Sequence, residues 1–472
     1  MMFMSFLMLF PLGVSIIYEE KTINLLAFII PIGVFLIGGK LLSFKKAKSR
    51  KFGAREGFII VALIWLLMSL IGCLPFIISK EIPNFFDAFF EITSGFTTTG
   101  SSIVTDVTSL SKSILFWRSF SHWIGGMGIL VLILALIPES KEGSSMHILR
   151  AESPGPQVGK LVSKMKVTSR ILYLIYLGLT ILEVIFLWSG PDKQMDLFHS
   201  IIYSLGTAGT GGLAIDPYSL EFYSSYSQYV IAIFMIIFGI NFTIFYLLLV
   251  GNFKEVLKNE EIKMYFIVVA ISVIIITINT YNMYNNLETT FRHSLFQVSS
   301  IISTTGYSTT NFDVWPSLSK TIILILMVFG GCAGSTAGGA KLSRIMILAK
   351  SSKRKLKMMI SPRKVETVKM NGKSIDESTI EGVQSYMMVY FIIFIVCGLL
   401  ISVDGKDILT NLTASLACIS NVGPGFNLVG PYGSYSVFSD FSKVVLSLEM
   451  IAGRLELFPL LLLLYPKTWM NK

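Results

Sequence analysis

The chain has 472 residues, of which 53% are hydrophobic and only 14% are charged, and its mean hydropathy is +0.68. Soluble domains carry roughly a quarter charged residues, so this composition excludes an ordinary soluble protein and indicates a membrane protein. The net charge of +10 does not indicate nucleic acid as a partner, because Lys and Arg gather in short connections between apolar runs, as in cytoplasmic loops.

Apolar runs of about 20 residues, the length that spans a bilayer, follow one another along the chain. We predict an all-α polytopic membrane protein with about ten spans. The run that ends at 349 is too long for one straight span, and glycines interrupt its middle. The runs are 2–18, 23–44, 57–79, 114–137, 170–189, 228–251, 263–284, 319–349, 382–402 and 441–466.

The charged residues in the connections predict the orientation of these spans. The connections 45–55, 141–170 and 350–373 are rich in Lys and Arg, whereas the alternate connections are acidic or balanced. One topology places every basic connection in the cytoplasm, and it also places both termini there. The basic run 350–373 is then most simply a solvated loop that anionic membrane lipid attracts, and contact with a cytosolic partner is the alternative.

Four of the outer connections share one plan: a short amphipathic stretch, then a stretch rich in Gly, Thr and Ser, then a polar exit. A single such connection would be interpreted as an ordinary turn. Its recurrence at the same place in four successive units favours a repeated transport architecture instead. The stretches are 97–100, 206–212, 303–306 and 420–423.

This plan suits the selectivity filter of a cation pore. A filter replaces the hydration shell of the ion with carbonyl oxygens, and irregular backbone is tolerated at membrane depth only where it is buried or lines water. Glycine adopts the unusual dihedral angles that such a backbone needs. The predicted organisation is an N-terminal helix pair, 1–44, and four span–pore-loop–span repeats around a pseudo-fourfold pore, at 57–137, 170–251, 263–349 and 382–466.

The sequence resembles the Trk/Ktr/HKT superfamily of K⁺ transport proteins, and within it the bacterial TrkH type, which the extra N-terminal helix pair favours. The resemblance covers nearly the whole chain. It rests on SGFTTTGSS (94–102), HWIGGMGILVLILALIP (122–138), GTAGTGGLAID (206–216), STTGYSTTNF (303–312), GGCAGSTAGGAKLSRIMIL (330–348), NVGPGF (421–426) and GRLELFPLLLL (453–463).

The resemblance implies which residues bind K⁺ in the filter. One glycine per repeat would form the filter, and the residues just before it would offer carbonyl oxygens to the ion. Members often have His nine positions before the second glycine, where this chain has Tyr203, and we expect this residue to pack in the pore helix. The implied filter residues are Thr98, Thr99, Gly100, Thr210, Gly211, Gly212, Thr304, Thr305, Gly306, Asn421, Val422 and Gly423.

The resemblance also implies a gate below the filter. The glycines at 330, 334 and 338 alone would suit close helix packing. Further weak helix formers join them, so we expect an intramembrane loop at 332–338 that obstructs the pore, with Gly334, Ser335 and Thr336 as gating residues. Arg454 lies inside the last run, as a fixed charge beside the pore or as the partner of Glu449 or Glu456.

The resemblance implies a homodimer in the bacterial cytoplasmic (inner) membrane, on a cytosolic TrkA-type regulatory ring with nucleotide-binding domains. This chain has no nucleotide-binding motif, so any nucleotide would bind the partner chain. The expected cargo is K⁺, and no spacing of Cys or His predicts a transition metal.

Two alternatives remain open. A Na⁺ or mixed Na⁺/K⁺ transporter of the same fold is weakened by glycine at all four filter positions, since the plant Na⁺-passing relatives often have Ser in the first repeat. A membrane-embedded enzyme would need paired Asp or His on facing helices, and we find no such pair in the sequence, so we expect no enzyme.

Overall fold

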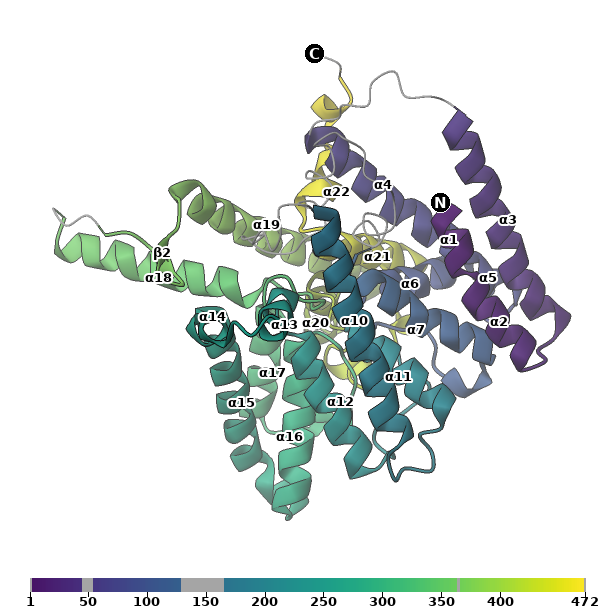
Figure 1. The fold of residues 1–472 in the computed structure, drawn as a ribbon, viewed down its shortest axis with the longest axis horizontal. Helices are drawn as coiled ribbons and strands as arrows, with labels where there is room; N and C mark the ends of the chain where they lie inside the picture. The colour runs from purple at the N-terminus through teal and green to yellow at the C-terminus, as the bar shows by residue number, and fades with distance from the viewer. Residues whose placement is uncertain (1, 45–53, 129–164, 363–365, 471–472) are drawn as a thin grey trace.

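The computed structural model describes residues 2–44, 54–128, 165–362 and 366–470 (Figure 1). Within these ranges the chain is mostly helical. One short antiparallel hairpin, β1 (Lys369–Met370) with β2 (Lys373–Ser374), is added to the helices. The predicted all-α fold class is confirmed.

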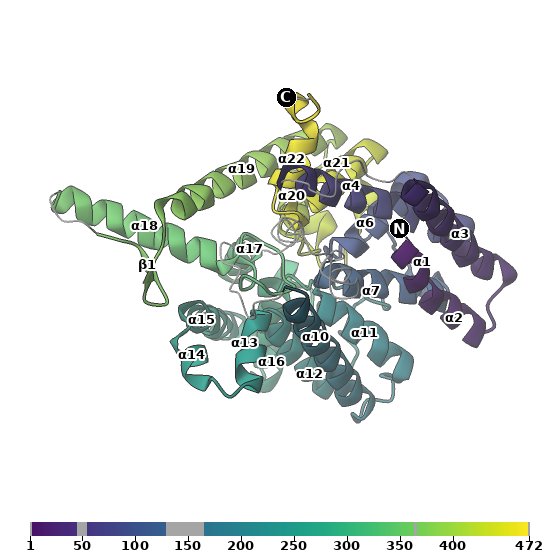
Figure 2. The same ribbon diagram turned by 45° about the horizontal axis from the view of Figure 1, so that its top comes forward.

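The N-terminal helices lie together at one edge of the molecule in both views (Figures 1 and 2). Here α1 (Met2–Leu7) and α2 (Leu9–Ile17) pack against the long α3 (Thr22–Phe44), and α2 also packs against α7 of the first repeat. They form the predicted helix pair, since α1 and α2 together make the first apolar run.

The rest of the helices form four successive units, each with a pore helix between flanking helices. Unit one contains α4 (Ala54–Gly72), α5 (Leu74–Ile78), the pore helix α6 (Phe85–Phe96) and α7 (Lys112–Gly126). Unit two contains α10 (Met165–Trp188), the pore helix α11 (Leu197–Gly209), α12 (Ser225–Phe238) and α13 (Phe242–Leu249), and α14 (Phe253–Lys258) follows it. Unit three contains α15 (Glu260–Tyr284), the pore helix α16 (Leu287–Ile302), α17 (Ser317–Phe329) and α18 (Leu342–Ile360). Unit four contains α19 (Glu377–Ile401), the pore helix α20 (Ile408–Ser420), α21 (Asp440–Arg454) and α22 (Phe458–Leu464).

The packing between units is cyclic. The helix after each pore helix packs against the pore helix of the next unit: α7 on α11, α12 on α16, α17 on α20, and α21 back on α6. Four units that contact one another in this order close into a ring, so the pore helices surround one central axis.

Each pore helix begins at a side chain that caps its first turn. The residues are Asn84, Asp196, Asn286 and Asp407, and each accepts a backbone N–H from the first turn at 2.8–3.0 Å. Asn and Asp are preferred at this position because they satisfy N–H groups that the helix itself leaves unpaired. The caps fix where each helix begins and therefore where its C-terminal end meets the axis.

Not every predicted span is one continuous helix. Five helices of the described ranges are long and apolar enough to cross a membrane, and α12 with α13 makes a further span bent by 93°. The runs expected at 228–251 and 441–466 are broken, at 239–241 and at 455–457. Hydropathy reports composition and not continuity, and a helix surrounded by protein can break where neighbouring segments satisfy the freed backbone groups.

The third unit sends an arm away from the bundle. The helix α18 extends outward, the β-hairpin lies beside it and α19 returns to the body (Figures 1 and 2). A small apolar cluster, which includes Ile347, Met370 and Ile380, holds the arm together. Residues 129–137 of the fourth predicted span and most of the basic connections 45–55 and 141–170 lie outside the described residues.

Glycines let the pore helices approach their neighbours closely, and this yields a stability prediction. A Cβ atom on Gly209 of α11 would overlap the backbone of His122 in α7, which cannot move as a flexible side chain would. We expect Gly209→Ala to lower the free energy of unfolding by about 1–3 kcal/mol, as overpacking does. Thermal unfolding in detergent measures the effect.

The control is Gly178→Ala in α10, where a Cβ atom has nothing within 4 Å. This helical Gly→Ala change should leave the protein as stable as the wild type or stabilise it by about 0.5–1 kcal/mol. Equal melting temperatures for the two variants would contradict the packing described here.

Candidate functional site

The backbone after each pore helix repeats one unusual conformation four times. Two or three residues separate each helix end from its predicted filter glycine. Two residues before that glycine stands a non-glycine residue with φ between 53° and 58°, and the glycine itself has φ between 71° and 98°. Such angles are rare for residues with a side chain, so their recurrence in register marks four equivalent segments. They are Thr98–Thr99–Gly100, Thr210–Gly211–Gly212, Thr304–Thr305–Gly306 and Asn421–Val422–Gly423.

The four glycines form a closed ring. A Cβ atom on Gly100 would overlap the carbonyl oxygen of Gly211. A Cβ atom on Gly212 would overlap that of Thr305, and one on Gly306 would overlap that of Val422. A Cβ atom on Gly423 would lie 2.8 Å from the carbonyl oxygen of Thr99, which returns the sequence of contacts to the first unit. Each predicted filter glycine therefore touches the carbonyl group that precedes the glycine of the next unit.

A cavity of about 160 Å³ lies on one side of this ring. All four predicted filter glycines line it, together with residues of the segments that follow them, including segments 213–219 and 429–435. Its volume is several times the share that one water molecule takes in the liquid, so the cavity is large enough for an ion with part of its hydration shell. We call it the outer vestibule, since the outer connections of the predicted topology form it.

A buried ion pair fixes the wall of the vestibule. Glu91 of α6 and Arg118 of α7 are 0% and 2% exposed, and their closest oxygen and nitrogen atoms are 2.7 Å apart. Glu91 also accepts the N–H of Ile103, while Arg118 donates to Ser102 Oγ and to the carbonyl oxygen of Ala214. The pair ties the segment after the first filter glycine to the segment after the second.

The helix-breaking stretch of the third unit contacts the opposite end of the filter segments. The helix α17 ends at Phe329 and α18 begins at Leu342, as the glycines predicted. In the loop between them, the N–H of Gly338 donates to Thr304 Oγ1 at 2.6 Å, and the N–H of Gly339 donates to the carbonyl oxygen of Ser420 at 2.7 Å. Both acceptors precede the filter glycines, so the loop and the vestibule lie on opposite sides of the ring.

Three further groups hold this loop. At the break between α12 and α13, Gly239 accepts the N–H of Cys332 at 2.9 Å, and the N–H of Phe242 donates to Gly334 at 3.1 Å. Glu261 of α15 is 6% exposed, and its Oε1 accepts the N–H of Ala333 at 2.7 Å and the N–H of Ser343 at 3.2 Å. The break that hydropathy did not predict thus has a function in the fold, because it binds the loop.

Arg454 is the third group. Its guanidinium donates to the carbonyl oxygen of Thr336 at 2.8 Å and to those of Gly125 and Gly126, the last residues of α7, at 2.6 Å each. A cation is favourable at a helix C-terminus, where carbonyl groups lack helical partners. Of the two carboxylates considered as partners from the sequence, Glu456 pairs with Arg344, and Glu449 accepts the hydroxyl of Ser415.

Two polar groups of the site were not singled out from the sequence as site residues. Tyr203 was expected only to pack, but its hydroxyl donates to Asp216 Oδ2 and to the carbonyl oxygen of Ser219, at 3.2 Å each, so this expectation missed its polar contact. Glu261 stands in an acidic pair at the start of a predicted span, on the side where basic residues prevail. An acidic pair on that side was the available signal.

Four re-entrant loops that close around one axis, inside an all-α membrane protein, define the class of membrane transport proteins with a central pore. The comparisons with known proteins agree. The family model of TrkH, described as cation transport protein, matches residues 25–470. The chain therefore belongs to the TrkH family.

Individual relatives support the assignment. The chain is 35% identical to the Trk system potassium uptake protein TrkH of Escherichia coli K12, over 98% of this chain and 95% of the relative. It is 33% identical to the protein TrkG of the same strain, over 98% and 96%. The crystal structure of the potassium transporter TrkH from Vibrio parahaemolyticus superposes with a TM-score of 0.88 at 31% identity and covers 99% of this chain and 97% of that one.

The ring geometry yields a prediction for Gly100→Ser. A side chain there would be strained at φ +82° and would displace the carbonyl group of Gly211. We expect the permeability ratio of K⁺ to Na⁺ to fall while expression is retained. The measurement is reversal potentials or competitive flux with the purified protein in liposomes.

Gly251→Ser is the matched control, because Gly251 has a similar φ of +78° but a Cβ atom there has nothing within 4 Å. This variant should keep the wild-type ratio. If Gly100→Ser also keeps the wild-type ratio, Gly100 is not part of the filter.

Proposed function

We propose that this chain takes up K⁺ across the bacterial cytoplasmic membrane, through a filter formed by the four glycine-centred segments. The observation that carries the proposal is the closed ring in which each glycine touches a carbonyl group of the next segment. The relatives are named as a potassium uptake protein and a potassium transporter, and for this reason we propose K⁺ as the ion.

The chemistry follows from the ring. A K⁺ ion leaves its hydration shell only if several oxygen atoms replace it, and rings of backbone carbonyls do this in K⁺ filters. The carbonyl groups of Thr99, Gly211, Thr305 and Val422 stand at equivalent places in the four segments, so we assign them to the ion, together with the residues beside them. The pore helices end just before the filter, and their C-terminal ends favour a cation.

We further propose that the loop at 332–338 closes the pore below the filter and that Arg454 holds it closed. The contacts of Gly338 and Gly339 support its position directly below the filter segments. Glu261 binds the loop at Ala333 and binds Ser343 just beyond it, and Arg454 binds the loop at Thr336, so the loop can open only when these bonds are exchanged for others.

The predicted partners and orientation belong to the same proposal. The arm of α18 carries exposed basic residues, including Lys353 and Lys355, and ends in the exposed Met359 and Ile360. A surface of this kind suits anionic lipid, a second copy of the chain or a cytosolic regulatory ring. We propose a homodimer with both termini in the cytoplasm and with nucleotide bound only by the regulatory partner.

The test of the proposed function is flux of ⁸⁶Rb⁺ or K⁺ into liposomes that contain the pure protein. We expect K⁺ and Rb⁺ to be carried and Na⁺ to compete weakly. Equal transport of Na⁺ would favour the mixed Na⁺/K⁺ alternative. Protein that is folded and carries neither ion, with or without a cytosolic regulator, would refute the proposal.

The gate yields a prediction for Arg454→Ala. The change removes the bond to Thr336 and leaves the carbonyl groups of Gly125 and Gly126 without this donor. We expect a higher flux per folded molecule in the absence of any regulator, and deletion within 332–338 should act in the same direction. Liposome flux and thermal unfolding in detergent are measured on the same samples.

Arg354→Ala is the control, since Arg354 pairs with Glu377 on the arm, far along α18 from the loop. It should keep the wild-type flux. A destabilised Arg454→Ala protein with wild-type flux per folded molecule would show that Arg454 stabilises the fold and does not close the pore.

A further inference from the structure

The outer vestibule contains an unbalanced negative charge. Among the described residues that line it, Arg118 and Asp216 carry charge. Arg118 is paired with the buried Glu91, so the ion pair is neutral as a unit. Asp216 has no such cationic partner among the described residues, so its carboxylate leaves a negative charge on the wall of the vestibule.

Two tyrosine hydroxyls fix this carboxylate. Tyr203 and Tyr223 both donate to Asp216 Oδ2, at 3.2 and 2.5 Å. The two rings lie edge to face with their centroids 5.3 Å apart, so they support each other. Burial and the bond to Asp216 raise the pKa of the Tyr223 phenol, which therefore stays protonated and remains a donor. Oδ1 has no hydrogen-bond partner among the described residues.

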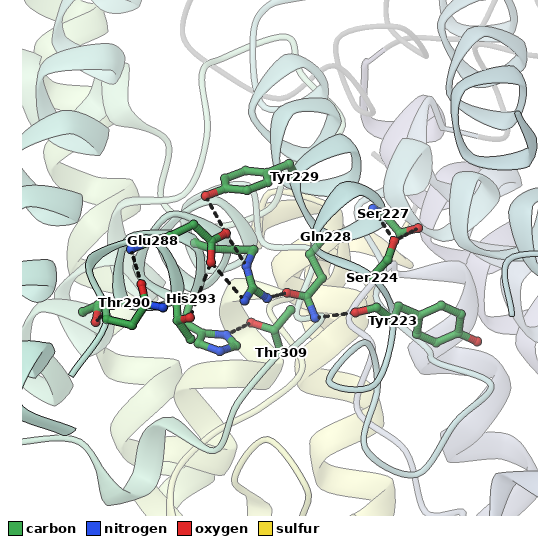
Figure 3. A network of polar contacts seen from close by, with 12 residues as sticks. Tyr223, Ser224, Ser227, Gln228, Tyr229, Glu288, Thr290, His293 and Thr309 are labelled. Carbon is green, nitrogen blue, oxygen red and sulfur yellow. Dashed lines mark hydrogen bonds and ion pairs between the residues drawn. The ribbon is translucent and has the colours of Figure 1, made fainter. Parts of the chain in front are cut away.

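A polar network fixes the segment that carries Tyr223. Gln228 lies at its centre (Figure 3), and its amide nitrogen donates to the carbonyl oxygens of Leu220 and Tyr223 at 2.7 and 3.2 Å. Its amide oxygen accepts from Arg292, which is itself paired with Glu288 at 2.9 Å. The network joins α12 to the pore helix α16, so groups from two units hold this part of the vestibule wall.

We propose that Asp216 forms an outer binding site for a monovalent cation, which the ion occupies in the vestibule before it reaches the glycine ring. The proposal rests on the proposed K⁺ function. Both hydroxyls bind Oδ2 and leave Oδ1 free for a partly hydrated cation. A fixed carboxylate in a narrow cavity raises the local concentration of cations and hence the rate of capture at low external concentration. Tyr203 and Tyr223 are positioning residues that keep the carboxylate in place.

The test is the initial rate of ⁸⁶Rb⁺ uptake into liposomes as a function of external K⁺ or Rb⁺, with Asp216→Asn. The change removes the charge and keeps the size of the side chain. We expect the half-saturating concentration to rise by about tenfold, while the rate at saturation stays near that of the wild type. This change is at the lower end of the increase in local ion concentration and association rate that charged clefts produce. Asp216→Glu, which restores the charge, should recover most of the affinity.

The matched control is Glu221→Gln. Glu221 is an exposed carboxylate of the same connection that accepts the hydroxyl of the vestibule residue Tyr432, but it does not line the cavity itself. Its loss should change the half-saturating concentration much less. Equal shifts for the two variants would mean a general effect of surface charge, and an unchanged Asp216→Asn would mean that no site exists. Either result overturns the proposal.

Failure of the proposed function and failure of the outer site give different results. If the wild type carries neither K⁺ nor Rb⁺, the proposed function fails first. If Asp216→Asn does not fold, Tyr223→Phe provides the test, because it keeps the charge and removes one donor to Oδ2. We expect a smaller rise in the half-saturating concentration for Tyr223→Phe, and a wild-type value would overturn the proposal.

Discussion

Each of the four proposed filter glycines packs against a carbonyl group of the next unit, and this contact leaves no room for a Cβ atom. The arrangement of the rest of the structure follows from it. Pore helices must end at a common axis, so each is capped by Asn or Asp at its start and packed between helices of its own and the preceding unit. The helices can approach so closely because glycines such as Gly125, Gly126 and Gly209 stand at the contacts.

The filter and the loop below it form one connected structure. The loop donates to Thr304 and to the carbonyl group of Ser420, and it is held by Glu261, by Arg454 and by the break between α12 and α13. Groups from all four units therefore meet at the loop, because Arg454 also binds the end of α7. Movement of the loop would break or change bonds to groups of every unit. The loop is therefore a suitable element for control by a partner chain.

The sequence predicted the features that depend on local chemistry. The apolar runs predicted the helices. The repeated glycines predicted the four segments and the interruption between α17 and α18. It did not predict contacts that depend on how the units meet. The breaks at 239–241 and 455–457 lie inside runs that are apolar on average, and such an average does not register the Gly, Asn and Pro residues at or beside the breaks. The bonds of Tyr203 to Asp216 and of Glu261 to the loop join residues whose proximity only the assembled fold defines.

The central claim is that four carbonyl groups around the glycine ring replace the hydration shell of K⁺. Anomalous diffraction from crystals grown in Rb⁺ or Tl⁺, both of which scatter anomalously and resemble K⁺ in size, tests it most directly. The account predicts density on the axis of the ring, at the level of the carbonyl groups of Thr99, Gly211, Thr305 and Val422. An axis without density, in crystals of a protein that carries the same ion in liposomes, would contradict it.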